Sequence, residues 1–464
     1  AGWRMRTIIW GAGQVGYNIA SYLAKEHNDV TVIDLKSELI AKISDEQDVK
    51  GIVGFASNPE TLKQAGAEDA DMIVAVTHSD EVNMVACQVA HSLFNVPKKI
   101  ARIRQAGYLD PVWANLFSRA HMPIDVIISP EREVAHNIYE RLKTPGTIDT
   151  ISLLGGEAYC LSVVCNSSCP ILHTPLKQLL NLFPDLDVKI LLISRAGKHI
   201  LPDLDNQFFE NDEVTFVVRK EHVTRVLSIF GHEENEAGKI LIIGAGNIGT
   251  QLCHILTENN KNLDLRLIEA SAARAQQLSE SFPKAMILHG DALDKKIMEE
   301  AGIENIETVV SVTNDDEVNI LSALLASEKG HTRTITLVNK EIYTSLTSAL
   351  NINAIVSPRL ITASTIMKYV RRGRINATHS IKDDFAEIIE VKASESCQII
   401  NTPLEKLHLP PGVIIGLIKR DHDILLPDKN TVIKPDDVLI VFAIHHSVAY
   451  VEKLFSFKFD LLYM

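Results

Sequence analysis

Three glycines with the spacing G-x-G-x-x-G follow an apolar run near the start of the chain, at Gly11, Gly13 and Gly16. In a strand-turn-helix unit, the first glycine makes a tight turn and the second admits a pyrophosphate close to the backbone. The third glycine lets the helix pack on the strand. Asp34 ends the next apolar run, about 20 residues on, where a carboxylate that binds ribose hydroxyls is expected. The spacing therefore predicts a nucleotide-binding site.

The same pattern occurs a second time in the chain. Gly244, Gly246 and Gly249 repeat the glycine spacing, and Glu269 closes the following apolar run as Asp34 does in the first copy. The two turns are separated by far more than the period of a solenoid repeat. We therefore expect a duplicated domain with two nucleotide sites.

The residues of both turns are expected to contact phosphate through their backbone amides. A helix N-terminus offers free N–H groups and a partial positive charge, which suit a diphosphate; a tight turn without a ligand is the alternative. Asp34 and Glu269 would repel a 2′-phosphate, which favours NAD or ADP/ATP over NADP, although each could instead be a solvated acid at a strand end. The predicted turn residues are Gly11, Ala12, Gly13, Gln14, Val15 and Gly16, and then Gly244, Ala245, Gly246, Asn247, Ile248 and Gly249.

Further candidates lie where later strands end, because the carboxyl ends of parallel strands line the ligand crevice. They are Thr77 and His78 in the first copy and Thr313 and Asn314 in the second. The threonines could alternatively cap the helices that follow.

Arg102 and Arg104 lie on the expected fifth strand, where alternation would place both guanidinium groups on one face. Thr336 and Val338 are taken as their counterparts. If Arg102 reaches a phosphate, the first copy binds the more anionic ligand, and Arg102→Ala would reduce that affinity. A surface salt bridge is the competing interpretation.

The elements that position these residues follow from the alternation of apolar runs and helical patterns, which predicts a parallel sheet with helices on both faces. One helix is expected over 79–94, with a single buried stripe. The first-copy strands are expected to begin near Thr7, Val30, Val49, Met72, Ile100 and Ile124. The buried stripe is predicted to consist of Val82, Val85, Ala86, Val89, Ala90 and Leu93.

Two shorter segments, one after each large repeat, resemble each other in sequence: both contain a Thr-Pro-Leu motif and, farther on, a Ser-Arg or Lys-Arg pair. Their short β runs, proline-started helix and hairpin predict small mixed lobes with an antiparallel sheet. The fold class is thus α/β, with two Rossmann-like doubly wound domains, each followed by a small α+β lobe. The predicted domains are 5–142, 148–231, 237–370 and 379–458.

Composition limits the classes of function. A net charge of −13 argues against a nucleic-acid partner, and the densest basic run, 368–374, is expected to be a solvated helix end. No apolar run is long enough to span a membrane, so we expect a soluble, cytoplasmic protein.

The cysteines and histidines do not indicate a metal site. Cys160, Cys165 and Cys169 lack the paired spacing of a zinc site and are interpreted as ordinary thiols. His445 and His446 are adjacent, so on a strand they would point to opposite faces, and we predict no metal site there either.

The four-part order resembles the RCK (regulator of K⁺ conductance, or KTN) family. The wording that carries this resemblance is Gly-Ala-Gly-Gln-Val-Gly at 11–16, Ala-Gly-Ala-Glu-Asp-Ala-Asp at 65–71, Ala-Val-Thr at 75–77 and Asp-Glu-Val-Asn in both copies. The first copy departs from a common family wording, since it has Phe55 where the second has Asp291. The resemblance therefore implies a ligand contact at Asp291, after the third strand of the second copy. It supports the equivalent contact in the first copy less well.

The tandem form resembles cytoplasmic regulatory subunits of bacterial Trk potassium uptake systems. That resemblance implies a homodimeric or homotetrameric ring at the inner face of the membrane, which binds NAD(H) or ATP/ADP and acts on a TrkH- or TrkG-like translocating subunit. An NAD-dependent oxidoreductase is the alternative function. It would need a substrate domain with an acid or base over the nicotinamide, and two small duplicated segments are an unusual way to build one. We therefore predict no catalytic residues and no enzyme activity.

Overall fold

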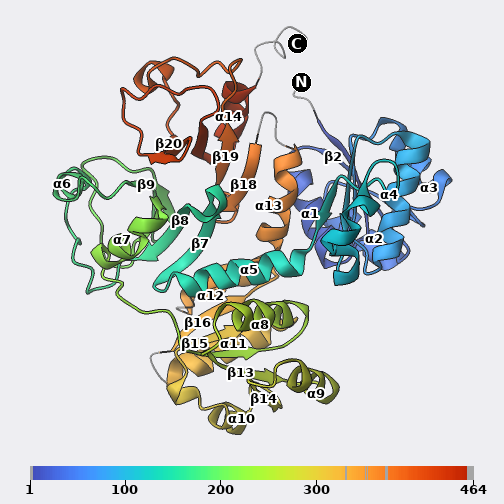
Figure 1. The fold of residues 1–464 in the computed structure, drawn as a ribbon, viewed down its shortest axis with the longest axis horizontal. Helices are drawn as coiled ribbons and strands as arrows, with labels where there is room; N and C mark the ends of the chain where they lie inside the picture. The colour runs from blue at the N-terminus through green and yellow to red at the C-terminus, as the bar shows by residue number, and fades with distance from the viewer. Residues whose placement is uncertain (1–3, 330–331, 351, 353, 371–374, 457–464) are drawn as a thin grey trace. The chain divides into compact units, whose positions relative to one another are not determined.

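The computed structural model describes residues 4–329, 332–350, 352, 354–370 and 375–456. Contacts divide the chain into two compact units, one of residues 1–133 with 359–370 and one of 134–358 with 371–464. Figure 1 labels the helices and strands of both units. Among the described residues, no helix combines the length and apolarity needed to cross a bilayer.

The first Rossmann lobe is built on a six-stranded parallel sheet in the order β3-β2-β1-β4-β5-β6. This is the doubly wound order in which ligands bind outside the carboxyl ends of the central strands. Its elements are β1 (Arg6–Trp10), α1 (Gln14–Lys25), β2 (Asp29–Asp34), α2 (Ser37–Glu46), β3 (Lys50–Val53), α3 (Pro59–Gln64), η1 (Ala67–Asp69), β4 (Met72–Ala75), α4 (Asp80–Phe94), β5 (Lys98–Arg102), η2 (Ala106–Leu109), η3 (Pro111–Phe117), β6 (Val126–Ile128) and α5 (Pro130–Lys143).

The second Rossmann lobe repeats this sheet in the order β14-β13-β12-β15-β16-β17. The duplication of a doubly wound domain is thereby confirmed. Its elements are β12 (Lys239–Ile243), α8 (Asn247–Asn259), β13 (Asp264–Glu269), α9 (Ala272–Ser281), β14 (Met286–His289), α10 (Lys295–Glu300), η6 (Ile303–Asn305), β15 (Thr308–Ser311), α11 (Asp316–Lys329), β16 (Arg333–Leu337), α12 (Glu341–Ala349), β17 (Ala354–Val356) and α13 (Pro358–Val370).

The two small lobes each hold a five-stranded antiparallel sheet, with the matching orders β7-β8-β11-β9-β10 and β18-β19-β22-β20-β21. The first contains β7 (Thr147–Leu153), η4 (Leu154–Gly156), β8 (Ala158–Val164), α6 (Leu176–Leu182), β9 (Val188–Arg195), β10 (Lys198–Ile200), β11 (Glu213–Arg219), η5 (Lys220–His222) and α7 (Val223–Ile229). The second contains β18 (Ile375–Ile381), β19 (Ala386–Lys392), η7 (Leu404–Leu407), β20 (Val413–Arg420), β21 (Asp423–Leu425), β22 (Val438–Ile444), η8 (His445–Ser447) and α14 (Val448–Phe455).

The same ion pair closes the hairpin region of both small lobes. Arg195 donates from Nε to Asp212 at 2.8 Å, and Arg420 donates from Nε to Asp437 at 2.9 Å. The two sheets share one hydrophobic cluster, and a Cβ on Gly416 of β20 would lie 2.6 Å from a methyl group of Val217 on β11. A glycine is needed at that point because the sheets approach so closely.

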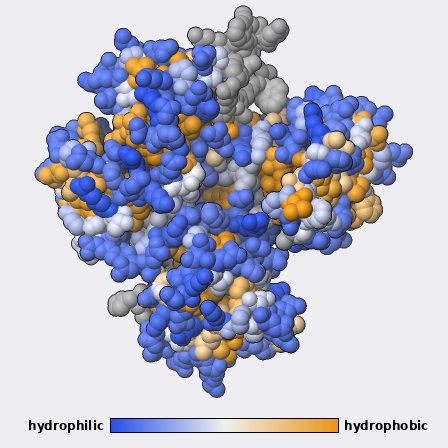
Figure 2. Space-filling model, viewed as in Figure 1, coloured by the Kyte–Doolittle hydropathy of each residue, from blue (hydrophilic) through white to orange (hydrophobic). Residues whose placement is uncertain are grey.

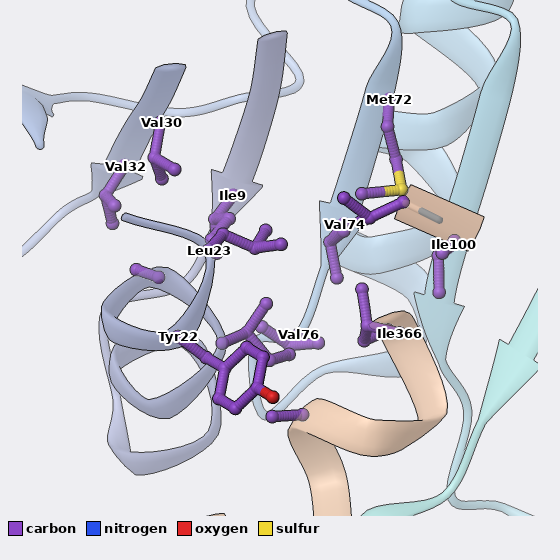
Figure 3. Close-up of a cluster of buried hydrophobic side chains, with 14 of the residues drawn as sticks. Ile9, Tyr22, Leu23, Val30, Val32, Met72, Val74, Val76, Ile100 and Ile366 are labelled. Carbon is purple, nitrogen blue, oxygen red and sulfur yellow. The ribbon is translucent and has the colours of Figure 1, made fainter. Parts of the chain in front are cut away.

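The last helix of the second repeat, α13, packs in the core of the first lobe. Ile366 is fully buried in the same cluster as Ile9, Val74 and Ile100, and Figure 3 shows it among these side chains. The orange helix α13 also lies next to α1 in Figure 1. Residues 371–374 of the predicted basic helix end lie outside the described part of the chain.

Most of α5, the corresponding helix of the first repeat, belongs to the other unit. There, Arg141 donates to the carbonyl of Ile355 in β17 at 2.7 Å and to Asp149 of β7 at 2.7 Å. The predicted boundaries 5–142, 148–231, 237–370 and 379–458 describe the repeat, and they remain a prediction as domain limits because the compact units exchange their terminal helices.

The predicted strand positions are confirmed to within two residues, and Ser79 caps α4 through a hydrogen bond from the amide of Val82. The predicted stripe of α4 is wrong in part. Val85 and Leu93 are 45% and 58% exposed, whereas Asn83 is fully buried. The apolar pattern missed this rotation because a polar residue, Asn83, is needed on the inner face to bond neighbouring loops. All six cysteines are buried free thiols.

Candidate functional site

The first glycine turn has the tight geometry that its sequence predicts. Gly11 has φ +106°, which favours glycine, and its amide donates to the carbonyl of Ile33 at 2.9 Å. Gly13 is the N-cap of α1, and a Cβ there would have no neighbour within 4 Å. A Cβ on Gly16 would stand 1.7 Å from the carbonyl oxygen of Gly11. The third glycine is therefore a packing requirement, and the second leaves open space.

Asp34 ends β2 and ties the turn to the next loop. One carboxylate oxygen accepts from the amide of Ala12 at 2.8 Å, and the other accepts from the amide of Lys36 at 2.8 Å. These bonds fix the carboxylate at the mouth of the turn. Each oxygen has two lone pairs, so the group can still accept from ribose hydroxyls.

A cavity of about 390 Å³ lies over the carboxyl ends of these strands. It brings together eight of the ten residues predicted for the first site, while Ala12 and Gly16 do not line it. Apolar surface from Trp10, Leu39 and Phe55 also lines it, as suits a planar base. The predicted residues in the lining are Gly11, Gly13, Gln14, Val15, Asp34, Thr77, His78 and Arg102.

The loop with Thr77 and His78 is held by Asn83 of α4. The Asn83 carboxamide oxygen accepts from the amide of Thr77 at 2.9 Å and from its hydroxyl at 2.7 Å. The Asn83 nitrogen donates to the carbonyl of Arg102 at 2.9 Å. The Thr77 hydroxyl is therefore used in shaping the loop, and contact of Thr77 with a ligand remains a prediction.

Three cations, Arg102, Arg104 and Lys36, act on His78 at the cavity. Burial lowers the pKa of His78, and the neighbouring charge of Arg102 lowers it further. Arg104 and Lys36 act in the same direction, and only Glu131 opposes them. The imidazole of His78 is therefore mainly neutral at neutral pH, and the permanent cations provide the positive charge.

Arg102 is only 5% exposed and forms an ion pair with Glu131, in the first turn of α5. Arg102 is thus an ion-pair partner, but in a buried pair and not in the surface salt bridge of the competing interpretation. Contact of Arg102 with a phosphate stays a prediction. Arg104 lies beyond the end of β5 and donates to the carbonyl of His78. The strand alternation used to place both arginines on one face does not extend to Arg104.

The predicted counterparts Thr336 and Val338 are wrong by one position. The register pairs Ala75 with Ala101 in the first sheet and Ser311 with Thr336 in the second. Arg102 therefore corresponds to Leu337, and both carbonyls accept from the equivalent asparagine of the preceding helix. The contrast between the copies is sharper than predicted, because the second copy has an apolar side chain at this position.

The second glycine turn has the same construction. Glu269 is 5% exposed and accepts from the amides of Ala245 at 2.9 Å and Ser271 at 2.8 Å. A Cβ on Gly249 would lie 2.2 Å from the carbonyl oxygen of Gly244. The equivalent residues Gly246, Asn247 and Ile248 open α8, and their ligand contacts remain predictions.

Three other candidates of the second copy have different surroundings. The Thr313 hydroxyl donates to Asn319 at 2.7 Å, as Thr77 does to Asn83. Asp291 is exposed and accepts from the amide of Leu293 at 2.8 Å, which is a turn contact. Asn314 is exposed. These residues lie near the strand ends as predicted. Thr313 and Asp291 form hydrogen bonds within their own loops, and contact of all three with a ligand stays a prediction.

Sequence reasoning missed several residues that shape the sites. Asp80 is 3% exposed and accepts from the amides of Arg104 and Gln105, and Asp316 does the same for Asn339 and Lys340 in the second lobe. The repeated Asp-Glu-Val-Asn motif could have indicated these residues, because its Asp and Asn side chains each hold a loop in both lobes. Arg274, 3.7 Å from Glu269, had no such signal.

Comparison with known proteins agrees with this architecture. The TrkA-N domain model matches residues 7–130 and 240–358, and the TrkA-C domain model matches 388–456. A Trk system potassium uptake protein TrkA from Azorhizobium caulinodans is 44% identical over 98% of this chain and all of the relative. Its counterpart from Halomonas elongata is 36% identical over 97% of this chain and 99% of the relative.

Solved structures show the same fold. The GsuK RCK domain covers 98% of this chain and 95% of its own, with a TM-score of 0.60 at 17% identity. A structure of the GsuK channel bound to NAD covers 98% of this chain and 79% of its own, with a TM-score of 0.61 at 17% identity. With two TrkA-N lobes, a matching TrkA-C lobe and full-length relatives above 30% identity, the chain belongs to the TrkA family of Trk system potassium uptake proteins.

Proposed function

We propose that this chain is a nucleotide-responsive regulatory subunit of a Trk-type K⁺ uptake system, located at the inner face of the membrane, and that it is not an enzyme. The observation that carries the proposal is the open cavity over the first glycine turn, where Asp34 and Arg102 line one space. Family membership provides the transport context. The NAD bound to the GsuK channel supports an adenine nucleotide as the ligand class.

NAD(H) or ATP/ADP would be held mainly by residues of the turn. The amides of Gln14 and Val15, at the start of α1, would face the diphosphate, and Asp34 would accept from the ribose. A bound nucleotide supplies no chemistry here beyond its shape and charge. It can shift the conformation of the chain only to the extent that it binds one arrangement more tightly than another.

The first prediction concerns Asp34. Replacing it with alanine removes a charged acceptor for ribose hydroxyls, which is worth about 1.5–3 kcal/mol. We expect NAD and ATP affinity at the first site to fall about 10- to 100-fold. Titration calorimetry on the full chain measures this, with Glu269→Ala as the matched change in the second copy. Unchanged affinity in both variants, in folded protein, would contradict the assignment.

The regulatory role is tested by K⁺ flux through a TrkH- or TrkG-like subunit in vesicles. We expect adenine nucleotides to change the flux only when this chain is present. The Asp34→Ala and Glu269→Ala double variant should lose that response while still co-purifying with the membrane subunit. A nucleotide-independent flux, or stoichiometric turnover of a substrate with cofactor reduction, would reject the proposal.

Assembly into a homodimer or homotetramer is part of the proposal and is supported by exposed apolar residues at the same place in both repeats. Val112 and Trp113 on η3 are 75% and 60% exposed, and Ile342 and Leu346 on α12 are 71% and 51% exposed. Figure 2 shows hydrophobic residues interrupting the hydrophilic surface of the first lobe. We expect Trp113→Glu combined with Ile342→Glu to lower the mass measured by light scattering, with Val53→Glu, at an exposed position on β3, as the control.

A further inference from the structure

Arg102 is a buried cation in the wall of the candidate nucleotide site. It stands at the end of β5, is 5% exposed, and lines the same cavity as Gly11 and Asp34. Placing a guanidinium in such a position is costly unless an anion balances it. The identity of that anion decides what the site can accept.

The balancing anion is Glu131, whose side chain comes from the first turn of α5. One nitrogen of Arg102 contacts one oxygen of Glu131, and the side chains are 6% and 13% exposed. The pair is incomplete: within the described part of the chain, Nε of Arg102 and Oε2 of Glu131 have no hydrogen-bond partner although both are buried. A fork-on-fork arrangement would satisfy both atoms, so Arg102, which lines the cavity, retains one donor without a partner.

The other charged groups around the cavity do not replace Glu131. Asp34 is held at the glycine turn by the amides of Ala12 and Lys36, and Lys36 and Arg104 are cations. Glu131 is the anion that opposes their effect on His78. In the absence of a nucleotide, therefore, the Glu131 carboxylate forms the ion pair with Arg102. A ligand phosphate would have to replace Glu131 to pair with the same guanidinium.

We propose that Glu131 is an internal competitor for Arg102, and that the first site therefore favours nucleotides with a terminal, dianionic phosphate. A terminal phosphate carries more charge than a carboxylate and can displace it, whereas the phosphodiester groups of a dinucleotide carry a single charge each. The inference rests on the proposed function, because it refines which ligand the same cavity takes.

The second copy provides an internal contrast. Leu337 corresponds to Arg102, and the Pro358-Arg359 sequence stands where the first copy has Pro130-Glu131. The second site thus has neither member of the competing pair. A change at Glu131 should alter binding at the first site and leave the second unaffected.

The test is a double-mutant cycle by titration calorimetry on the full chain, with Glu269→Ala in every protein to weaken the second site. The variants are Glu131→Gln, Arg102→Ala and both together, and the probes are ATP, ADP and NAD. We expect Glu131→Gln to raise ATP and ADP affinity about tenfold, because the neutral amide keeps its shape and loses its hold on the guanidinium. Arg102→Ala should lower it about tenfold.

The decisive result is the double variant. If Glu131 acts through Arg102, Glu131→Gln has no effect on affinity once Arg102 is alanine. An equal gain in the Arg102→Ala background, or no gain in the single variant, would overturn the inference. If the Glu131→Gln variant does not fold, Glu131→Asp is used instead. Its shorter side chain holds the carboxylate farther from Arg102, so we expect ATP and ADP affinity to rise, but by less than in Glu131→Gln. Failure of the parent protein to bind any adenine nucleotide would instead reject the proposed function.

Discussion

Alanine at Gly16 is expected to destabilise the first Rossmann lobe by more than about 3 kcal/mol. Its Cβ would stand 1.7 Å from the carbonyl oxygen of Gly11 and 2.9 Å from the carbonyl carbon. Both are backbone atoms at the junction of β1 and α1, so neither can move without displacing the strand or the helix. Nucleotide binding at this site should be lost together with the fold of the turn.

Urea unfolding followed by tryptophan fluorescence measures this effect selectively. Trp10 on β1 and Trp113 on η3 both lie in the first lobe, so their emission reports the unfolding of that lobe. Gly13→Ala is the matched control, because a Cβ there meets nothing within 4 Å. Its stability should fall by about 1 kcal/mol or less, the cost of alanine in place of glycine at a helix N-cap. Nucleotide affinity should fall because the pyrophosphate can no longer approach. Wild-type stability in Gly16→Ala would contradict the packing argument.

Acidification is expected to destabilise the unit that contains the small lobes, through His379 on β18. Burial lowers the pKa of His379 to about 4, and the charge of Asp149 offsets this only in part. In the unfolded chain the imidazole of His379 is protonated as the pH falls through about 6.5, whereas in the folded chain it is protonated only near pH 4. Stability is therefore unaffected above pH 6.5 and falls by about 3 kcal/mol as the pH drops from 6.5 to 4.

Replacing His379 with glutamine should flatten this part of the stability profile. Urea unfolding followed by circular dichroism, between pH 4 and pH 7.5, gives the slope for each protein. His422→Gln, in the exposed turn between β20 and β21, is the control and should retain the wild-type slope. An unchanged slope in His379→Gln would show that other groups cause the acid sensitivity.

The glycine turns and their carboxylates could be predicted because they depend on local rules. Gly11 and Gly16 have the strain and close contact that their spacing implies, and Asp34 lies where a strand end must place it. The alternation of strands and helices followed from the apolar patterns, and the duplication followed from the repeated motifs. The repeat also marked Asn83 and Asn319, although their role as loop anchors required the hydrogen bonds to be visible.

Longer-range features could not be predicted in this way. The pairing of Arg102 with Glu131 joins residues 29 apart in sequence, and no periodicity encodes such a contact. The alignment of Thr336 with Arg102 failed by one position because an apolar run does not mark where its strand ends. Val85 and Leu93 fit the spacing of a buried stripe, but spacing alone cannot separate a core face from an exposed apolar face.

The placement of α13 also limits how this protein could be divided. A fragment that stops before residue 358 would lack the side chain of Ile366 against Ile9 and Val74, and would leave that apolar surface open to water. A gene fragment encoding one repeat is therefore expected to yield aggregates, whereas two fragments made together could complete each other.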